Sequence, residues 1–137
     1  MGNVVYEKGT IPNEKDIESI YNDANWTTYT SDLPCLINAI KNSLLTVTAW
    51  DGSKLVGLIR IVGDGVTIIY IQDIIVLKSY KRKGIGTHLI NIVFEEYKVV
   101  RQKVLLTDDT PETRGFYESL GFVSCDKGQL VSFVKFG

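Results

Sequence analysis

The spacing of apolar residues predicts a chain that alternates between helices and strands. Residues 4–6 form a short apolar run typical of a strand, and helical spacing follows from Pro12 onward. A second helical pattern starts near Asp32, whose carboxylate can cap the first turn of a helix. We therefore expect one strand and two helices before residue 42.

After residue 42 the apolar spacing changes from helical to strand-like. Residues 44–50 and 55–62 are rich in strand-forming residues, and Asp51-Gly52 between them is a strong hairpin signal. Residues 66–77 form a third, nearly all-apolar run, which is typical of a strand buried on both faces. Together the three runs predict an antiparallel meander.

Helices and strands alternate again in the rest of the chain. Helical spacing covers residues 84–97, and a short apolar strand covers residues 104–107. A strand, a helix and a strand in succession favour parallel pairing through a crossover. Another helix starts at Thr110-Pro111 and is expected to end at Gly121.

The last predicted strands are residues 122–124 and 129–136. The order of all elements predicts an α/β (α+β) fold with a mixed, mostly antiparallel central sheet of about seven strands and about four flanking helices. Because the chain has 137 residues and no low-complexity linker, we expect a single domain over residues 1–137.

Composition narrows the class of protein without naming its function. The chain is 45% hydrophobic and carries 15 basic against 16 acidic side chains, so nothing favours a nucleic-acid or membrane partner. Cys35 and Cys125 lie 90 residues apart, which favours two free thiols in core positions and a reducing cytoplasm. The single histidine, His88, excludes a histidine-rich metal site, and we expect no metal.

The segment between the long apolar strand and the next helix has the chemistry of an anion site. Gly84 and Gly86 let backbone N–H groups approach a ligand, and the following helix directs its positive end to the same place. Three consecutive basic residues precede them, so phosphate groups are the natural partner. The segment lacks Gly-Lys-Ser/Thr and a third glycine, which excludes a P-loop and a dinucleotide fingerprint. The alternative is a tight strand-to-helix turn on a solvated basic face.

Two motifs in this half of the chain resemble those of the GNAT superfamily of acetyl-CoA-dependent N-acetyltransferases. Residues 81–86, Lys-Arg-Lys-Gly-Ile-Gly, are similar to its Arg/Gln-x-x-Gly-x-Gly/Ala signature, with lysine in the first position. Downstream, Tyr117, Gly121 and Phe122 match a second family motif, whereas threonines replace its asparagine and alanine. The resemblance runs from residue 44 to the C-terminus and implies a GNAT-like fold.

The resemblance implies how acetyl-CoA binds and reacts. Backbone groups of strand residues pair with the pantetheine arm, and one N–H polarises the thioester carbonyl. Tyr117 protonates the departing CoA thiolate; the alternative is an amphipathic core tyrosine beside Phe116. The residues implied to bind the cofactor are Ile74, Ile75, Val76, Lys81, Arg82, Lys83, Gly84, Ile85, Gly86, Thr87, Thr110, Thr113, Phe116 and Tyr117.

Asp73 is the candidate for removing the proton from the acceptor amine. It is a charged residue inside an apolar strand, where burial is costly unless the carboxylate has a partner or a task. The polyamine-acetylating branch usually has glutamate where Gln72 stands, and glutamine cannot act as a base. Either Asp73 acts through water as a base or proton-relay member, or the chain orders water without a dedicated base. The other alternative is that Asp73 is a structural residue capping a β-bulge.

The predicted function is transfer of an acetyl group to a primary amine by direct attack. We expect a small-molecule amine, with a protein or peptide amine as one alternative and a non-catalytic acetyl-CoA sensor as the other. Gln72 and Thr110 favour the sensor because both depart from the family pattern. Family resemblance also implies a homodimer. The residues expected to contact the acceptor are Trp26, Tyr29, Gln72, Asp73 and Asp108.

Overall fold

The computed structural model of the protein describes residues 3–137 and divides the chain into two compact units. The first unit runs to Leu105 and contains the central sheet, whereas the second runs from Leu106 to Gly137. The expectation of a single domain over residues 1–137 stays a prediction. The mixed α/β fold class predicted from the apolar pattern is confirmed.

The sheet of the first unit is a meander extended by one parallel strand. Strands β1 to β4 pair antiparallel in chain order, and β5 pairs parallel with β4, as the strand-helix-strand pattern predicts. The strands are β1 (Val4–Lys8), β2 (Leu45–Asp51), β3 (Lys54–Gly63), β4 (Ile68–Val76) and β5 (Gln102–Leu105).

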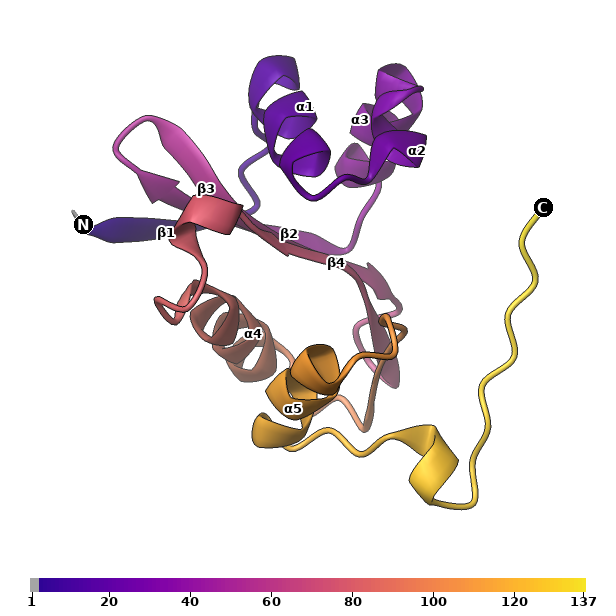
Figure 1. Ribbon diagram of the computed structural model, residues 1–137. Helices are drawn as coiled ribbons and strands as arrows, with labels where there is room; N and C mark the ends of the chain where they lie inside the picture. The colour runs from indigo at the N-terminus through magenta and orange to yellow at the C-terminus, as the bar shows by residue number, and fades with distance from the viewer. Residues whose placement is uncertain (1–2) are drawn as a thin grey trace. The chain divides into compact units, whose positions relative to one another are not determined.

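Helices cover both faces of this sheet (Figure 1). Three N-terminal helices lie on one face and α4 lies on the opposite face. Asn13 and Asp32 cap α1 and α3 through their side-chain oxygens, which is why these helices begin where the sequence predicts. The short α2 was not predicted, because its four residues are too few to show a helical period. The helices are α1 (Glu14–Asp23), α2 (Thr27–Thr30), α3 (Leu33–Lys41) and α4 (Ile85–Glu96).

Strand β4 is not buried on both faces, contrary to the prediction. Its burial alternates: Ile69, Ile71, Asp73 and Ile75 are buried, whereas Gln72 is exposed. The other residues on the Gln72 face are only partly covered. This mostly apolar strand therefore packs fully on one side only, and Asp73 lies on the buried side.

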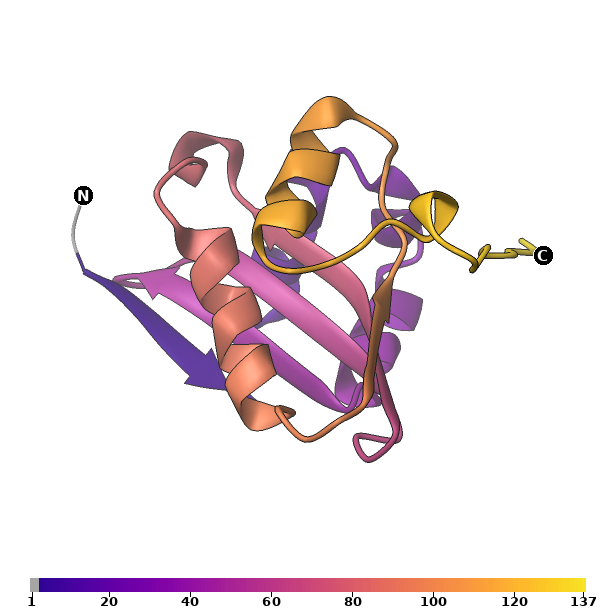
Figure 2. The same ribbon diagram turned by 90° about the horizontal axis from the view of Figure 1, so that it is seen from below.

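Helix α4 lies against the sheet (Figure 2), and the missing side chain of Gly57 allows the two to approach closely. A Cβ atom at this position would lie 3.0 Å from Ile85 Cγ2, 3.2 Å from Leu89 Cδ1 and 3.2 Å from Ala49 Cβ. Ile85 and Leu89 are both buried side chains of α4. The missing side chain of Gly57 therefore sets the distance between the helix and β3.

Replacing Gly57 with alanine is expected to lower the free energy of unfolding by about 1–3 kcal/mol, because the added methyl overpacks this contact. Chemical denaturation measures the change. Gly115→Ala is the matched control, since a Cβ atom there meets nothing within 4 Å and the position is helical. That variant is expected to be neutral or stabilising by up to about 1 kcal/mol. Equal losses in both variants would contradict the packing role of Gly57.

The second unit contains α5 (Pro111–Ser119) and an irregular C-terminal segment. The helix starts after Thr110, as predicted, and Gly121 has the left-handed φ of +94° expected where a helix stops. The two last predicted strands are absent: residues 122–124 and 129–136 form no strand, and a 3-10 helix, η2 (Cys125–Lys127), lies between them. Among the described residues the sheet thus has five strands rather than about seven, and five α-helices replace the four predicted.

Cys35 and Cys125 are free thiols as predicted, but both are exposed, so their expected core positions are wrong. His88 is also exposed and stacks on the ring of Tyr6, with ring centroids 3.9 Å apart. Over residues 3–137, no helix is long and apolar enough to cross a membrane. The same residues contain no group of three or more histidine, cysteine or carboxylate side chains placed to hold a metal ion.

Candidate active site

The predicted anion site is a sharply bent turn at the start of α4. Gly84 is the N-cap residue and has a left-handed φ of +82°. Arg82 also has a positive φ, +64°, a conformation that costs a non-glycine residue about 1–2 kcal/mol. The first bond of the helix runs from the N–H of His88 to the carbonyl of Gly84, so the N–H groups of residues 85–87 precede the helical ladder. These amides are available to an anion.

The chain leading into this turn is fixed by hydrogen bonds. Strand β4 is followed by a 3-10 helix, η1 (Lys78–Tyr80). The N–H of Lys78 donates to Asp23 at the end of α1 over 2.8 Å. The hydroxyl of Tyr80 donates to Asp51 at the end of β2 over 2.6 Å. The turn is thus attached to rigid elements, which is what a preorganised anion site needs.

The basic side chains of the turn face solvent. Lys81, Arg82 and Lys83 are exposed, as is Gly84. Ile85 is buried against the sheet, so only its backbone can contact a ligand. Gly86 and Thr87 are half-buried. All residues predicted to bind the pyrophosphate therefore lie together in one accessible turn.

The C-terminal half of β4 has a strand partner on one side only. On that side Ile74, Ile75 and Val76 pair with residues 57–59 of β3. On the other side, β5 pairs with β4 only from Ile68 to Ile71. Among the described strands, residues 72–76 therefore have no neighbour on their second edge. Backbone groups on that edge can bind an extended polar ligand, as the resemblance implied for the pantetheine arm.

A buried ion pair lies where this free edge begins. Asp73 is 2% exposed and Arg60 of β3 is 5% exposed. Arg60 Nε donates to Asp73 Oδ2 over 2.7 Å, and the hydroxyl of Tyr21 donates to the same oxygen over 2.8 Å. The hydroxyl of Tyr29 donates to Asp73 Oδ1 over 2.9 Å. Both oxygens of this carboxylate are therefore hydrogen-bonded, as burial of a charge requires.

This arrangement keeps Arg60 charged and both tyrosines neutral. Burial by itself lowers the pKa of Arg60, but the attraction of Asp73 outweighs burial and raises the pKa above its ordinary value. Burial, then the negative charge of Asp73, raises the pKa of Tyr21 far above its usual range. Burial also raises the pKa of Tyr29, although a hydrogen bond from Gln72 opposes the increase. The site thus presents a neutral phenol beside a paired carboxylate.

Strand β4 bulges at Gln72. Arg60 pairs with Asp73 and Ile61 pairs with Ile71, so Gln72 is the extra residue without a partner on β3. Its amide nitrogen donates to the Tyr29 hydroxyl over 3.0 Å. Asp73 is buried while Gln72 stays exposed, and yet both side chains hydrogen-bond the hydroxyl group of Tyr29.

Trp26 and Tyr29 form an aromatic group with Tyr21 on the α1 and α2 side of the sheet. The ring of Tyr29 meets that of Tyr21 edge-on at 5.2 Å, and Trp26 lies 6.0 Å from Tyr21. Both Trp26 and Tyr29 are half-buried. The guanidinium carbon of Arg60 lies 5.9 Å from the Tyr29 ring centroid, so a cation already contacts one ring. The fold therefore brings together four of the five residues predicted on the acceptor side.

In the second unit, Tyr117 lies in an apolar setting on α5. Its ring meets Phe116 edge-on at 5.0 Å and Phe122 edge-on at 5.7 Å. Burial raises the pKa of the phenol, and a side-chain hydrogen bond with Thr107 partly opposes that increase. Tyr117 is therefore neutral near pH 7 and retains a proton to donate.

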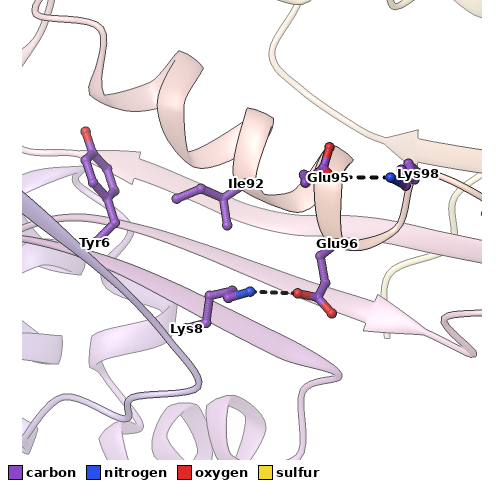
Figure 3. A pocket seen from close by; sticks show the side chains of 6 residues that line it. All are labelled: Tyr6, Lys8, Ile92, Glu95, Glu96 and Lys98. Carbon is purple, nitrogen blue, oxygen red and sulfur yellow. Dashed lines mark hydrogen bonds and ion pairs between the residues drawn. The ribbon is translucent and has the colours of Figure 1, made fainter.

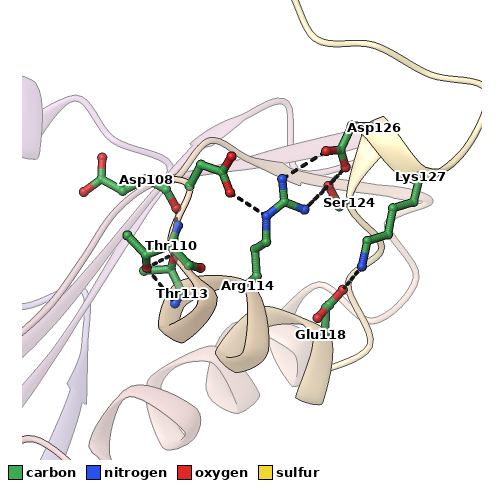
Figure 4. A network of polar contacts seen from close by, with 9 residues as sticks. Asp108, Thr110, Thr113, Arg114, Glu118, Ser124, Asp126 and Lys127 are labelled. Carbon is green, nitrogen blue, oxygen red and sulfur yellow. Dashed lines mark hydrogen bonds and ion pairs between the residues drawn. The ribbon is translucent and has the colours of Figure 1, made fainter.

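The threonines that replace the family's asparagine and alanine cap α5 (Figure 4). The side chain of Thr110 accepts from the N–H of Thr113 over 3.1 Å, and the Thr113 hydroxyl donates to the carbonyl of Asp108 over 2.6 Å. Their predicted roles in cofactor binding stay predictions. The side chain of Asp108 is exposed, whereas Asp109 forms an ion pair with Arg114 over 2.6 Å.

A groove of about 570 Å³ lies elsewhere, between β1 and the C-terminal end of α4 (Figure 3). Lys8 and Glu96 form an ion pair across it over 2.9 Å, and Lys98 pairs with Glu95 over 3.4 Å. Because these charges compensate one another, the groove offers no convergent charge to a ligand, and we assign it no role. Its lining residues are Tyr6, Lys8, Ile92, Glu95, Glu96 and Lys98.

A sequence profile of the acetyltransferase (GNAT) domain matches residues 12–136. The chain belongs to the GNAT acetyltransferase family. The resemblance inferred from two motifs is thereby confirmed, and it extends over nearly the whole chain rather than from residue 44 onward.

Similar proteins agree with this membership. An uncharacterized ycf52-like N-acetyltransferase from Prochlorococcus marinus is 32% identical over 101 residues, which are 69% of this chain and 55% of the relative. The chain thus spans about half the length of this curated relative. A GNAT-family acetyltransferase from Streptococcus pneumoniae TIGR4 is 33% identical, with a TM-score of 0.88 and 98% of each chain covered. A protein of unknown function from meticillin-resistant Staphylococcus aureus is 26% identical and has a TM-score of 0.73. The similarity covers 98% of this chain and 100% of that protein.

Sequence reasoning missed three residues that contact the candidate site residues Asp73 and Tyr117. Arg60 and Tyr21 bind Asp73, and Thr107 bonds the Tyr117 hydroxyl. Arg60 carried a usable signal, because it is the charged residue in an otherwise apolar strand that pairs with the strand of Asp73. Tyr21 and Thr107 carried no such signal. Tyrosine is common on the apolar face of a helix, and threonine is common near the end of a strand.

Proposed function

We propose that this GNAT protein transfers the acetyl group of acetyl-CoA to a primary amine, most simply that of a small molecule. The observation that carries the proposal is the continuity of two features on β4. Residues 72–76 have a free backbone edge, and the same strand leads through η1 into the anion-binding turn before α4. An extended ligand that ends in phosphates fits both at once.

The residues of the turn and strand divide the binding of acetyl-CoA between them. Acetyl-CoA supplies an acetyl thioester when bound. The backbone N–H groups of residues 85–87 and the side chains of Lys81, Arg82 and Lys83 bind its pyrophosphate. Backbone groups of Ile74, Ile75 and Val76 bind the pantetheine arm, and an N–H of this edge stabilises the oxyanion that forms at the thioester carbon.

Acetyl transfer then needs two proton movements. The amine nitrogen forms a bond to the acetyl carbon, the carbon–sulfur bond breaks, and Tyr117 donates its hydroxyl proton to the departing sulfur. The proton lost by the amine passes to the Tyr29 oxygen as the Tyr29 hydroxyl proton moves to Asp73 Oδ1, 2.9 Å away. Asp73 acts here as a relay member, while Arg60 holds the carboxylate in place.

A small cationic acceptor is supported by the surroundings of Tyr29. Trp26 and Tyr29 are half-buried aromatic side chains at one side of the β4 edge, and an ammonium group is attracted to such rings. A protein or peptide amine is the alternative acceptor. We also propose a cytoplasmic location, since both cysteines are free thiols, and a homodimer on the grounds of family resemblance.

The test is release of free thiol from acetyl-CoA across amines, polyamines, amino acids and peptides. We expect turnover with at least one amine and a faster rate with small cationic acceptors. A second candidate, the acetyl-CoA sensor, is favoured by Gln72, whose amide cannot act as a base. It predicts calorimetric binding of acetyl-CoA with no thiol release from any amine. Absence of acetyl-CoA binding would overturn both functions.

A further inference from the structure

The basic turn before α4, residues 81–83, is held at its two ends by different means. At its C-terminal end, Gly84 is the N-cap of α4, and Ile85 is buried against the sheet. At its N-terminal end lies Tyr80, the last residue of η1, whose hydroxyl donates to Asp51 Oδ2 over 2.6 Å. The three basic residues between these points are exposed. The position of Tyr80 therefore fixes where the turn begins.

Two residues of the β2–β3 hairpin hold the side chain of Tyr80. Asp51 is the last residue of β2 and Lys54 is the first of β3, and the two pair across the hairpin. Asp51 accepts from the Tyr80 hydroxyl, and Lys54 Nζ lies over the ring, 5.5 Å from its centroid. The hydrogen bond to Asp51 raises the pKa of Tyr80, so the phenol keeps its proton and remains a donor. The hairpin thus contacts both the hydroxyl and the face of this ring.

The backbone just before Tyr80 is attached to two other elements. The N–H of Leu77 donates to the carbonyl of Val56 on β3 over 3.0 Å, and the N–H of Lys78 donates to Asp23 on α1 over 2.8 Å. In the part of the chain that the structure describes, the Tyr80 hydroxyl makes the last hydrogen bond to another element before the turn. On this side, the turn is therefore joined to the sheet through the side chain of Tyr80.

The turn contains a backbone conformation that needs such support. Arg82 has a φ of +64°, in the left-handed region that a residue with a Cβ atom disfavours. A residue other than glycine keeps this conformation only where the surrounding structure imposes it. If the turn were released at Tyr80, the backbone of Arg82 could relax, and an anion would have to order the turn as it bound. Ordering a segment on binding lowers the affinity for the ligand.

We propose that Tyr80 and Asp51 are positioning residues for the phosphate end of acetyl-CoA. Their hydrogen bond connects the β2–β3 hairpin to the basic turn, so that the turn is ordered before the pyrophosphate arrives. Neither residue has to touch the cofactor, since the amides of residues 85–87 and the basic side chains supply the contacts. The inference rests on the proposed function, because it requires that this turn bind CoA.

The first test needs no ligand and measures NMR order parameters of the backbone amides. In Tyr80→Phe, the order parameters of residues 81–84 should fall from about 0.85 to below about 0.6, while those of β3 stay unchanged. Tyr97→Phe is the matched control, because Tyr97 is a half-buried tyrosine at the other end of α4. That variant should leave residues 81–84 as ordered as in the wild type. An equally ordered turn in Tyr80→Phe would overturn the positioning role.

The second test measures affinity for CoA by calorimetry. Tyr80→Phe is expected to raise the Kd for CoA about tenfold, whereas Tyr97→Phe leaves it within about twofold. In thiol-release assays, Tyr80→Phe should raise the KM for acetyl-CoA with kcat nearly unchanged, because the β4 edge that binds the thioester is intact. A general loss of structure would lower kcat as well, and that result would contradict a role confined to the turn.

Variants of Asp51 test whether the two residues act as one unit. Asp51→Ala should weaken CoA binding as much as Tyr80→Phe, whereas Asp51→Asn keeps an oxygen that accepts from the hydroxyl and should retain most of the affinity. The double variant Asp51→Ala with Tyr80→Phe should bind CoA no more weakly than either single variant. Multiplied losses in the double variant would mean that the residues act separately and would overturn the proposal.

The wild-type protein separates failure of this inference from failure of the proposed function. A wild type that binds CoA, together with a Tyr80→Phe variant that binds it equally well, would overturn the positioning role alone. A wild type that does not bind CoA would overturn the proposed function, and the positioning role for CoA with it.

Discussion

Replacing Arg60 with methionine is expected to lower the free energy of unfolding by about 3–5 kcal/mol. The substitution removes the guanidinium that bonds Asp73 over 2.7 Å and leaves a carboxylate that is only 2% exposed without its counter-charge. Two neutral phenols remain on Asp73, and they cannot balance its charge. Urea denaturation followed by circular dichroism measures the loss.

Two comparisons isolate the role of the ion pair. Lys98→Ala removes an ion pair with Glu95 whose side chains are 69% and 78% exposed, and it should cost at most about 1 kcal/mol. Arg60→Met combined with Asp73→Asn should recover part of the lost stability, because the buried charge is removed. The two tyrosines bond different carboxylate oxygens, so the amide oxygen still accepts from one of them and the amide nitrogen can donate to the hydroxyl oxygen of the other. If the double variant lost as much free energy of unfolding as Arg60→Met and Asp73→Asn lose in sum, the two residues would not act as a pair.

Replacing Tyr117 with phenylalanine is expected to reduce the turnover of acetyl-CoA by about 10²–10⁴-fold. The phenol is neutral at pH 7 even at the ordinary pKa of a tyrosine, and burial raises that pKa further, so it is the donor we propose for the departing sulfur. The substitution keeps the ring contacts with Phe116 and Phe122, which do not involve the hydroxyl. Thiol release at saturating acceptor measures the effect.

The Tyr117→Phe test requires that the substitution slow the chemical step while CoA affinity and stability change little. The affinity for CoA, measured by calorimetry, should stay within a few-fold, and the loss of one hydrogen bond with Thr107 should cost about 0.5–1.5 kcal/mol of stability. Tyr6→Phe is the matched control, because Tyr6 is a half-buried tyrosine that stacks on His88 outside the proposed site. Undiminished turnover in Tyr117→Phe would remove Tyr117 from the mechanism and return it to a packing role.

The conformation of the basic turn before α4 could be predicted because it depends on near neighbours in the sequence, whereas its binding of an anion stays a prediction. Lys81, Arg82 and Lys83 are consecutive, and Gly84 adopts a left-handed φ as the N-cap residue of α4. The cap of α5 was predicted for the same reason, since Thr110 and Thr113 bond within one helical turn. Interactions between near neighbours in sequence do not depend on how the rest of the chain folds.

The environment of Asp73 could not be predicted, because it depends on strand register. Its partners Tyr21, Tyr29 and Arg60 lie 52, 44 and 13 residues away in the chain. A bulge at Gln72 turns Asp73 inward and aligns it with Arg60, and a shift of one residue would have exposed it instead. The sequence could say only that a buried carboxylate needs a partner or a task.

The C-terminal segment shows most clearly the difference between what the sequence determines and what the tertiary structure decides. By itself, the sequence determined that residues 129–136 suit a strand, because valine and phenylalanine favour extended backbone, and it determined the glycine-containing basic turn before α4. Only the tertiary structure decided that this strand has no partner in its own unit. A strand needs a neighbouring backbone, and the bonds of Arg114 to Ser124 and Asp126 hold the nearest candidate against α5.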